Sequence, residues 1–317
     1  TQTASQEGYL SNKVTLNNLQ PGVTYYYQVT GKEIESFTTD DDTSDFSFIF
    51  VGDPQIGSSN SAKDDSPEDM QTPEFLTAQS EAVRNDSFNW NYTLNRAFAK
   101  TGNSANFILS AGDQIQTNYE DAEDTRISEI EYAGYLSPDV MKSVPVATTV
   151  GNHDADNPNY TYHFNIANMS DLGDNGYVGG DYYFTYGDAL FMILNTQDTN
   201  VSEHKKFIEE TVAANQDCKW RIVTLHQDIY GSAEHSNEPE ITNLRYSLVP
   251  IFEENDVDIV LTGHDHAYSR TKMLQGGQST TGFEYTDDEF DEQLDKDVDV
   301  GDSTETIYEA PANISDD

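Results

Sequence analysis

Gly263-His264-Asp265-His266-Ala267-Tyr268-Ser269-Arg270 is the most specific stretch of the chain, and it follows directly on the β-rich run 258–262. This run predicts a buried strand, because it is short, rich in branched apolar residues and bounded by glycine. A side chain at the carboxyl end of such a strand points into the crevice where open α/β sheets bind ligands. The two histidines are therefore candidates for a ligand site.

Four similar blocks precede this one, and each follows its own apolar, β-rich run. The runs and their blocks are 46–51 with Gly52-Asp53-Pro54-Gln55, 107–111 with Gly112-Asp113, 146–150 with Gly151-Asn152-His153-Asp154, and 221–225 with Leu225-His226. Five such ends from one sheet converge on one spot, although they are far apart in sequence. Glycine recurs in four of the five blocks, where it lets the backbone turn sharply beside a ligand.

The residue types in these blocks predict a pair of metal ions. Carboxylate and amide oxygens are hard ligands, whereas imidazole suits transition metals, so the mixture points to Fe, Mn or Zn rather than calcium. The inventory is larger than a single ion needs. One carboxylate must then bridge the pair, with the ions about 3.5–4 Å apart as in two-metal hydrolases. We therefore expect two divalent transition-metal ions.

The five blocks resemble those of the calcineurin-like metallophosphoesterases. The last block is most similar to the purple acid phosphatase branch, whose motif reads Gly-His-x-His-Ala-Tyr-x-Arg. The resemblance covers about residues 46–273. It implies an α/β fold, a four-layer α/β/β/α sandwich with the dinuclear site at one end.

The resemblance also implies a role for each matching metal ligand. By position these are Asp53 and His266 for the first ion, Asp113 as the bridge, and Asn152, His226 and His264 for the second ion. Gln55 stands where the wider superfamily has a histidine ligand, so it would coordinate through its amide oxygen or hold a water. Gln116 stands where purple members carry the tyrosine that colours their iron. We therefore predict a weakened first site and no purple colour.

Three residues are candidates for the chemistry itself. His153 resembles the histidine that contacts phosphate and protonates the leaving oxygen, a task for which histidine is a common choice. Asp154 is predicted to orient the His153 ring, with a helix or turn cap as the alternative. His235, nine residues beyond His226, corresponds to a further substrate-facing histidine of this branch.

The expected activity is metal-dependent hydrolysis of a phosphomonoester by in-line attack of activated water, as in acid phosphatases. A phosphodiesterase or nucleotidase with the same site is the first alternative, because pocket walls rather than metal blocks decide between them. A surface binding module that has lost catalysis is the second; the two glutamines favour it slightly, whereas the six intact site residues argue against it, namely Asp113, Asn152, His153, His226, His264 and His266. A structural zinc site does not fit, since such sites are closed and usually rich in cysteine.

Charge limits the partners. The chain has 57 acidic and 16 basic residues and a net charge of −41, which excludes a basic groove for nucleic acid. A small phosphate ester is still expected as substrate, because bound metal ions dominate the field locally. No apolar run reaches the roughly 20 residues of a membrane span. The single cysteine, Cys218, precludes an intrachain disulfide framework. Such acidity is familiar in secreted and salt-adapted proteins, so a secreted or cell-surface location is expected; the sequence leaves the oligomeric state open.

The chain divides into three parts by pattern. Residues 1–39 read as the end of a small fibronectin-like β domain, with a short β-hairpin appendage as the alternative, and 40–45 is a polar linker. Residues 46–317 form the catalytic domain, including an acidic segment 284–317 that we expect to be solvated. Helices are expected over 88–100, 123–136, 203–214 and 244–255, and a hairpin over 182–195. His204, at the start of one helix, is expected to be exposed.

Overall fold

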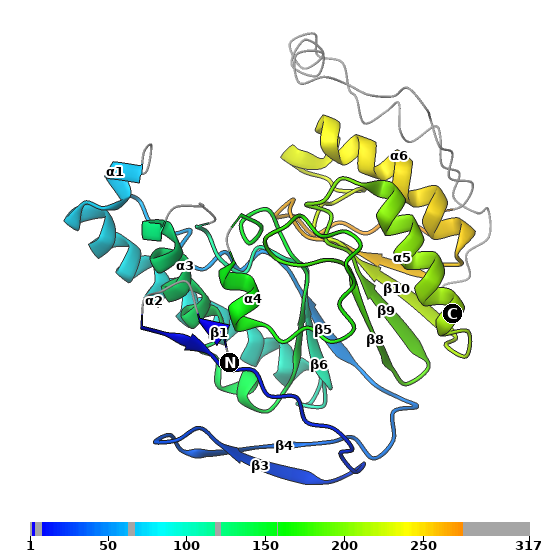
Figure 1. The fold of residues 1–317 in the computed structure, drawn as a ribbon, viewed down its shortest axis with the longest axis horizontal. Coiled ribbons are helices and arrows are strands. Elements are labelled where there is room, and N and C mark those ends of the chain that lie inside the picture. The colour runs from blue at the N-terminus through cyan, green and yellow to red at the C-terminus, as the bar shows by residue number, and fades with distance from the viewer. Residues whose placement is uncertain (1, 4–7, 63–66, 118–121, 157, 275–317) are drawn as a thin grey trace.

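The computed structural model describes residues 2–3, 8–62, 67–117, 122–156 and 158–274. Over these ranges two β-sheets stand between two groups of helices, with a separate hairpin on the N-terminal side (Figure 1). The acidic segment 284–317 lies outside the described residues. None of the helices in these ranges combines the length and the apolarity that crossing a membrane requires.

Each sheet carries some of the strand-end blocks. The first has the order β5 (Phe48–Val51), β6 (Phe107–Ser110), β7 (Val146–Thr148), and all three strands are parallel. The second has the order β11 (Ile259–Leu261), β10 (Trp220–Thr224), β9 (Ala189–Ile193), β8 (Tyr182–Tyr186). Only β8 and β9 pair antiparallel, as the predicted hairpin. The five strands were predicted correctly, but β11 is largely exposed rather than buried, with Ile259 44% exposed. The expectation that one sheet carries all five was also wrong.

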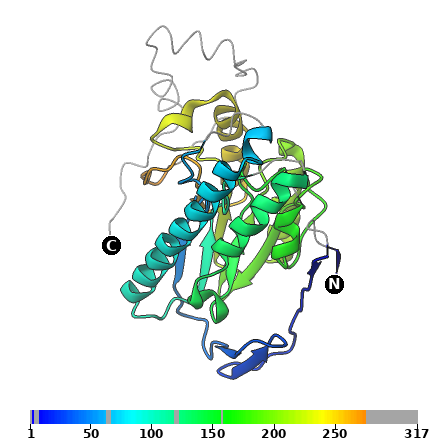
Figure 2. The same ribbon diagram turned by 90° about the vertical axis from the view of Figure 1, so that its left-hand side faces the viewer.

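Helices cover the outer face of each sheet. On the first sheet lie α2 (Pro73–Lys100), α3 (Ala122–Tyr135) and the short α4 (Asn159–His163), and on the second lie α5 (Val201–Ala214) and α6 (Pro239–Glu254). Figure 2 shows α2 and α3 side by side over the first sheet. Short elements complete this part, namely α1 (Pro67–Met70) and the 3-10 turns at Asp139–Lys142 and Glu234–Asn237.

The predicted helices are present, but α2 begins at Pro73 rather than at the predicted Phe88. The Thr72 side chain accepts a hydrogen bond from the N–H of Phe75 at 3.2 Å, and Pro73 occupies the first helical turn. Both features stabilise a helix N-terminus. Only a narrow stripe of this helix is buried, so most residues of its first turns are polar. From the sequence, such residues predict a loop.

Side-chain alternation along the strands produces the layers. Ile108 packs outward against α2 and α3, whereas Phe107 and Leu109 point inward to the second sheet. Likewise Met192 packs against α5 and α6, while Phe191 points inward and meets Phe107 edge-to-face at 5.4 Å. Each such buried side chain contributes about 1.5–3 kcal/mol. The α/β/β/α sandwich is therefore confirmed.

The N-terminal part is all β. Strands β3 (Thr24–Gln28) and β4 (Ile34–Thr38) form an antiparallel hairpin, and β1 (Gln2–Thr3) pairs with β2 (Leu10–Ser11). The hairpin touches the main body where the Tyr27 hydroxyl donates to the Lys142 carbonyl oxygen at 2.7 Å. A small β part is thus present, and its assignment to a fibronectin-like domain stays a prediction.

Candidate metal centre

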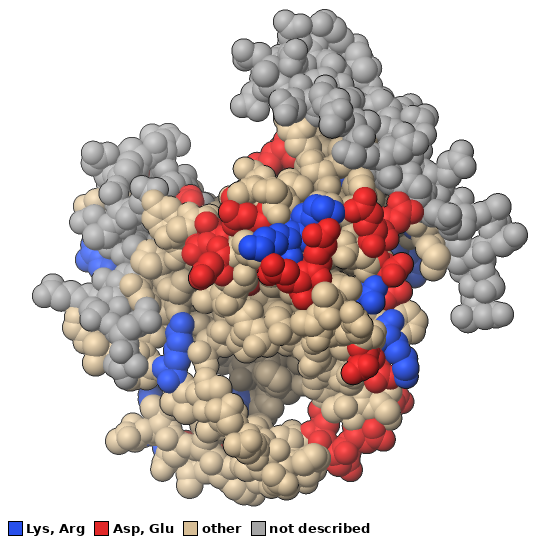
Figure 3. Space-filling model, turned by 45° about the vertical axis from the view of Figure 1, so that its right-hand side comes forward, with Lys and Arg blue, Asp and Glu red and all other residues tan. Residues whose placement is uncertain are grey.

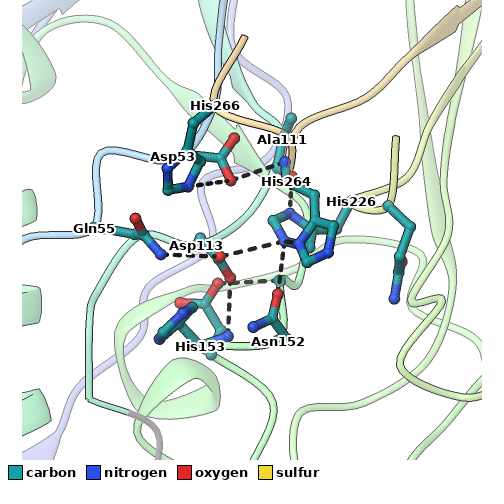
Figure 4. A network of polar contacts seen from close by, with 12 residues as sticks. Asp53, Gln55, Ala111, Asp113, Asn152, His153, His226, His264 and His266 are labelled. Atoms are coloured by element: carbon teal, nitrogen blue, oxygen red, sulfur yellow. Dashed lines mark hydrogen bonds and ion pairs between the residues drawn. The ribbon is translucent and has the colours of Figure 1, made fainter. Parts of the chain in front are cut away.

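The strand-end blocks of the two sheets meet at one place (Figure 4). Residues from the first sheet follow β5, β6 and β7, and residues from the second follow β10 and β11. The structure brings together Asp53, Gln55, Asp113, Asn152, His153, His226, His264 and His266, as Figure 4 shows. The site therefore lies between the sheets, where the edge strands β5 and β11 come together.

His226 is the centre of one group of contacts. Its Nδ1 donates to the Ala111 carbonyl oxygen at 2.8 Å, and its Nε2 points away from that carbonyl. Around Nε2 lie Asn152 Oδ1 at 3.0 Å, His264 Nδ1 at 3.2 Å and Asp113 Oδ2 at 3.3 Å. Three potential ligand atoms thus lie within 3.3 Å of His226 Nε2.

Asp53 is the centre of a second group. Its Oδ1 accepts a hydrogen bond from the His264 N–H at 2.9 Å and lies 3.8 Å from His266 Nε2. Gln55 is buried, and its amide nitrogen donates to Asp113 Oδ2 at 3.4 Å. Asp113 Oδ2 therefore contacts both Gln55 and His226, and Gln55 joins this network through its nitrogen.

The backbone is bent at these positions. Asp53, Asp113 and His264 have φ values of 53°, 50° and 71°, in the left-handed region that residues other than glycine rarely adopt. Such strain recurs at functional sites, where the surrounding structure holds it in place. Gly151 permits the closest approach, because a Cβ there would lie 2.1 Å from Asp113 Oδ1.

Burial and mutual charge shift the titration of the group. Burial raises the pKa of Asp53 to about 6. Burial opposes charge on both Asp113 and His226, but their mutual attraction outweighs it; the pKa of Asp113 is lowered and that of His226 is raised to about 9. Burial and the neighbouring histidines lower the pKa of His264 to about 4. Bound cations would take the place of the protons on these side chains.

His153 is held in place from two sides. Its N–H donates to Asp113 Oδ1 at 2.9 Å, and its ring Nδ1 lies 2.5 Å from the Gln116 carbonyl oxygen. Asp154 instead accepts hydrogen bonds from the Gly151 N–H at 3.1 Å and the Tyr132 hydroxyl at 2.9 Å. The contacts of Asp154 are those of the turn-cap alternative, and the backbone carbonyl of Gln116 orients the His153 ring.

His235 also reaches the centre. Its ring centroid lies 4.7 Å from that of His264, and its Nδ1 lies 2.6 Å from Glu238 Oε1. His235, Glu238 and His264 form one group whose spacing could hold a metal ion, and Asp113, His226 and His264 form another. Glu238 is not predicted from the sequence; its spacing three residues after His235 was the available signal.

A cavity of about 320 Å³ opens beside Asp53, between the end of β5 and helix α2. It is lined by Ser58, Asp86, Asn89, Trp90 and Thr93. The Asp86 carboxylate accepts hydrogen bonds from the N–H groups of Gly57 at 2.9 Å and Ser59 at 3.2 Å. These bonds tie the segment after Asp53 to α2. The cavity itself opens next to the candidate centre.

The fold and the site together define a two-sheet α/β protein with mixed oxygen and nitrogen ligand types at the strand ends. The family model of calcineurin-like phosphoesterases matches residues 46–268, and the chain belongs to this family. The family and its purple acid phosphatase relatives imply divalent metal ions. The predicted resemblance is thus confirmed.

Three relatives from Arabidopsis thaliana show which branch the chain is similar to. Purple acid phosphatase 4 is 27% identical over 198 residues, which cover 54% of this chain and 55% of that protein. Probable purple acid phosphatase 20 is 23% identical over 273 residues, covering 82% and 55%. Purple acid phosphatase 18 is 38% identical over 60 residues, covering 19% and 14%. The chain spans about half the length of the first two relatives.

Proposed function

We propose that the protein is a metal-dependent phosphoester hydrolase with a dinuclear centre, acting on small phosphomonoesters. The observation that carries this proposal is the arrangement around His226 Nε2. Nδ1 of this ring is committed to the Ala111 carbonyl, so neutral His226 presents a lone pair at Nε2. That lone pair faces the Asn152 amide oxygen and the Asp113 carboxylate, two further acceptors. Facing acceptors are unfavourable unless a proton or a cation lies between them.

We propose two ions rather than one, because the ligand types that the site brings together exceed the needs of a single ion. Asn152, His226 and His264 would hold one ion, Asp53 and His266 would hold the other, and Asp113 would bridge them. Asp113 supports this division, because its Oδ2 lies 3.3 Å from His226 Nε2 and 3.4 Å from the Gln55 amide nitrogen. The Ala111 carbonyl that fixes the His226 ring is the kind of outer partner that accompanies metal-binding histidines.

Two bound divalent ions supply charge that polarises phosphoryl oxygens and lowers the pKa of water. His153 would donate the proton that the leaving oxygen needs. Its ring is held by the Gln116 carbonyl and its backbone by Asp113, so it is fixed beside the centre. His235 would face the substrate from the rim. The cavity beside Asp53 offers room for the organic part of a small ester.

Gln55 and Gln116 bear on the metal rather than on the reaction class. Two neutral side chains stand where a histidine and a tyrosine are expected from the resemblance, so we propose divalent rather than ferric occupancy of the first site. Iron-loaded protein should then show no purple colour. A phosphodiesterase or nucleotidase remains the alternative within the same chemistry, and a binding module without catalysis is the alternative outside it.

The test combines metal analysis with hydrolysis of p-nitrophenyl phosphate and its bis-ester, with and without Mn, Zn, Fe or Co. We expect about two metal ions per chain and preferential turnover of the monoester. Asp113→Ala and His264→Ala should lose both metal and turnover, whereas Asp139→Ala, with its side chain 91% exposed, should lose neither. Preference for the bis-ester would favour the diesterase; absence of metal and turnover would leave the binding module.

We also propose a secreted or cell-surface location, which the strongly acidic composition supports. Hydrated surface carboxylates suit a protein exposed to high or variable salt. Cell fractionation with an antibody against the chain tests this, and recovery in the cytosolic fraction alone would contradict it.

A further inference from the structure

Asp265 stands between the two histidines of the last strand-end block, yet its carboxylate binds a different segment. The residue is 2% exposed. Its Oδ2 accepts hydrogen bonds from the Ala233 N–H at 2.7 Å and from the Ser236 hydroxyl, and its Oδ1 accepts one from the His235 N–H at 3.0 Å. Three donors from the turn 233–236 therefore end on one carboxylate.

This turn determines where the His235 ring lies. The ring centroid is 4.7 Å from that of His264, and the two rings are tilted by 39°. Since the His235 N–H is bound by Asp265, the backbone from which the ring projects is tied to the residue next to His264. The contact between the two rings thus depends on the hydrogen bonds of Asp265 as well as on the contact of His235 Nδ1 with Glu238 Oε1.

The same loop is held from its other side by Arg245 of α6. This arginine is 2% exposed; its Nε donates to the Ile229 carbonyl and its Nη2 donates to the Ser236 carbonyl. Gly231 lies against the carboxylate, and a Cβ there would be 2.3 Å from Asp265 Oδ2. Asp265 therefore binds the N–H groups of the loop, and Arg245 binds its carbonyl groups.

We propose that Asp265 is a positioning residue, which anchors the turn 233–236 and thereby holds the His235 imidazole against His264 at the rim of the candidate metal centre. A buried carboxylate with three donors forms charge-assisted hydrogen bonds, which are about twice as strong as neutral ones. An asparagine has nearly the same shape, but it lacks the charge and one of the two acceptor oxygens. Asp265→Asn should therefore loosen the turn without opening a cavity.

The kinetic test is a double-mutant cycle, and it rests on the proposed function. His235→Ala and Asp265→Asn should each lower kcat by about 10–100-fold, as outer partners of metal sites do. Asp265→Asn added to His235→Ala should lower kcat no further, because the residue it positions is already gone. Asp256→Asn is the control. Asp256 lies before β11, at the opposite end of that strand from Asp265, and its side chain is 90% exposed.

A second test needs no turnover. Hydrogen exchange measured by mass spectrometry should show the amides of residues 229–238 exchanging about 10-fold faster or more in Asp265→Asn, because two of these amides lose a charged acceptor. Peptides from α2 should be unchanged, which also shows that the variant folds. Ser236→Ala removes one donor only and should give a smaller change in the same direction.

The outcomes separate this proposal from the proposed function. Unchanged exchange over 229–238 in Asp265→Asn overturns the anchoring role, whatever the activity. A full multiplicative loss of kcat in the double variant, or loss of bound metal in Asp265→Asn alone, also overturns it, because Asp265 would then act on the metal ligands rather than through His235. A wild-type protein without turnover, but with faster exchange in the variant, contradicts only the proposed function.

Discussion

His226 and Ala111 come from different sheets, and the Nδ1 of His226 donates to the Ala111 carbonyl oxygen at 2.8 Å. This one bond fixes the imidazole so that Nε2 faces Asn152 and Asp113 (Figure 4). Ala111 follows β6 and His226 follows β10, so the bond also joins the two halves of the sandwich at the candidate centre. The site and the packing of the sheets therefore depend on each other.

Replacing His226 by Gln should remove one metal ion and lower kcat/KM by more than about 100-fold. The expected loss exceeds the 10–100-fold caused by removing outer partners of metal sites, because a direct ligand is lost. Metal analysis and hydrolysis of p-nitrophenyl phosphate measure both effects. His163→Gln is the matched control. His163 pairs with Glu129 away from the candidate centre, so this variant should keep the bound metal. Full metal content in His226→Gln would contradict the assigned ligand.

Gly151→Ala should displace Asp113, because the new Cβ would lie 2.1 Å from its Oδ1. We expect loss of bound metal and a destabilisation of about 1–3 kcal/mol, as for other overpacked sites. Urea unfolding and metal analysis test this. Gly102→Ala provides the comparison, since a Cβ there meets nothing within 4 Å although its φ is 65°. That variant should retain metal, and equal metal loss in both would refute the steric explanation.

His204 and Asp181 should make stability depend on pH. The prediction that His204 is exposed was wrong. It is fully buried, with Nδ1 2.8 Å from Asp181 Oδ2. Burial opposes the charge on His204, but Asp181 outweighs it and raises the pKa above the ordinary 6.5; burial also raises the pKa of Asp181. The folded state thus holds protons more tightly than the unfolded chain. This contribution is complete below pH 6.5 and is lost as the pH rises through the folded-state value.

Urea unfolding of metal-loaded protein between about pH 6 and pH 9 measures this slope. The double variant that combines His204→Gln with Asp181→Asn should flatten the slope relative to wild type, because neither replacement side chain titrates. His204→Ala alone should cost about 3–5 kcal/mol, because a buried carboxylate loses its partner. An identical slope in wild type and double variant would show that other groups cause the pH dependence.

Salt should stabilise the protein. Acidic side chains predominate over basic ones on the face shown in Figure 3, and the net charge of the chain is −41. Repulsion within such a surface destabilises the compact state, and about 1 M salt shortens the screening length to roughly 3 Å. We expect a higher Tm in about 1 M KCl than in about 0.05 M KCl. Sucrose of equal osmolarity controls for solute exclusion, and an equal rise in sucrose would contradict charge screening.

Much of the fold was predictable because it is written in local patterns. The strands before Asp53, Asp113 and His226 were recognisable as apolar runs that end at polar blocks. The hairpin 182–195 was recognisable by its turn at Gly187. Helix α2 was predicted only in its second half. Its first turns are polar on the solvent side, and the Thr72 cap becomes decisive only when the buried stripe of the helix is known.

The sequence by itself determined the α/β class, the strand-end blocks and the chemical types available to bind metal, since each depends on residues that are neighbours along the chain. Only the tertiary structure decided that two sheets supply the site, that Gln116 rather than Asp154 holds the His153 ring, and that His204 is buried against Asp181. It also decided that Asp265 binds the turn that carries His235. These relationships join residues from separate elements, and their partners are set by the packing of both sheets around a shared apolar core.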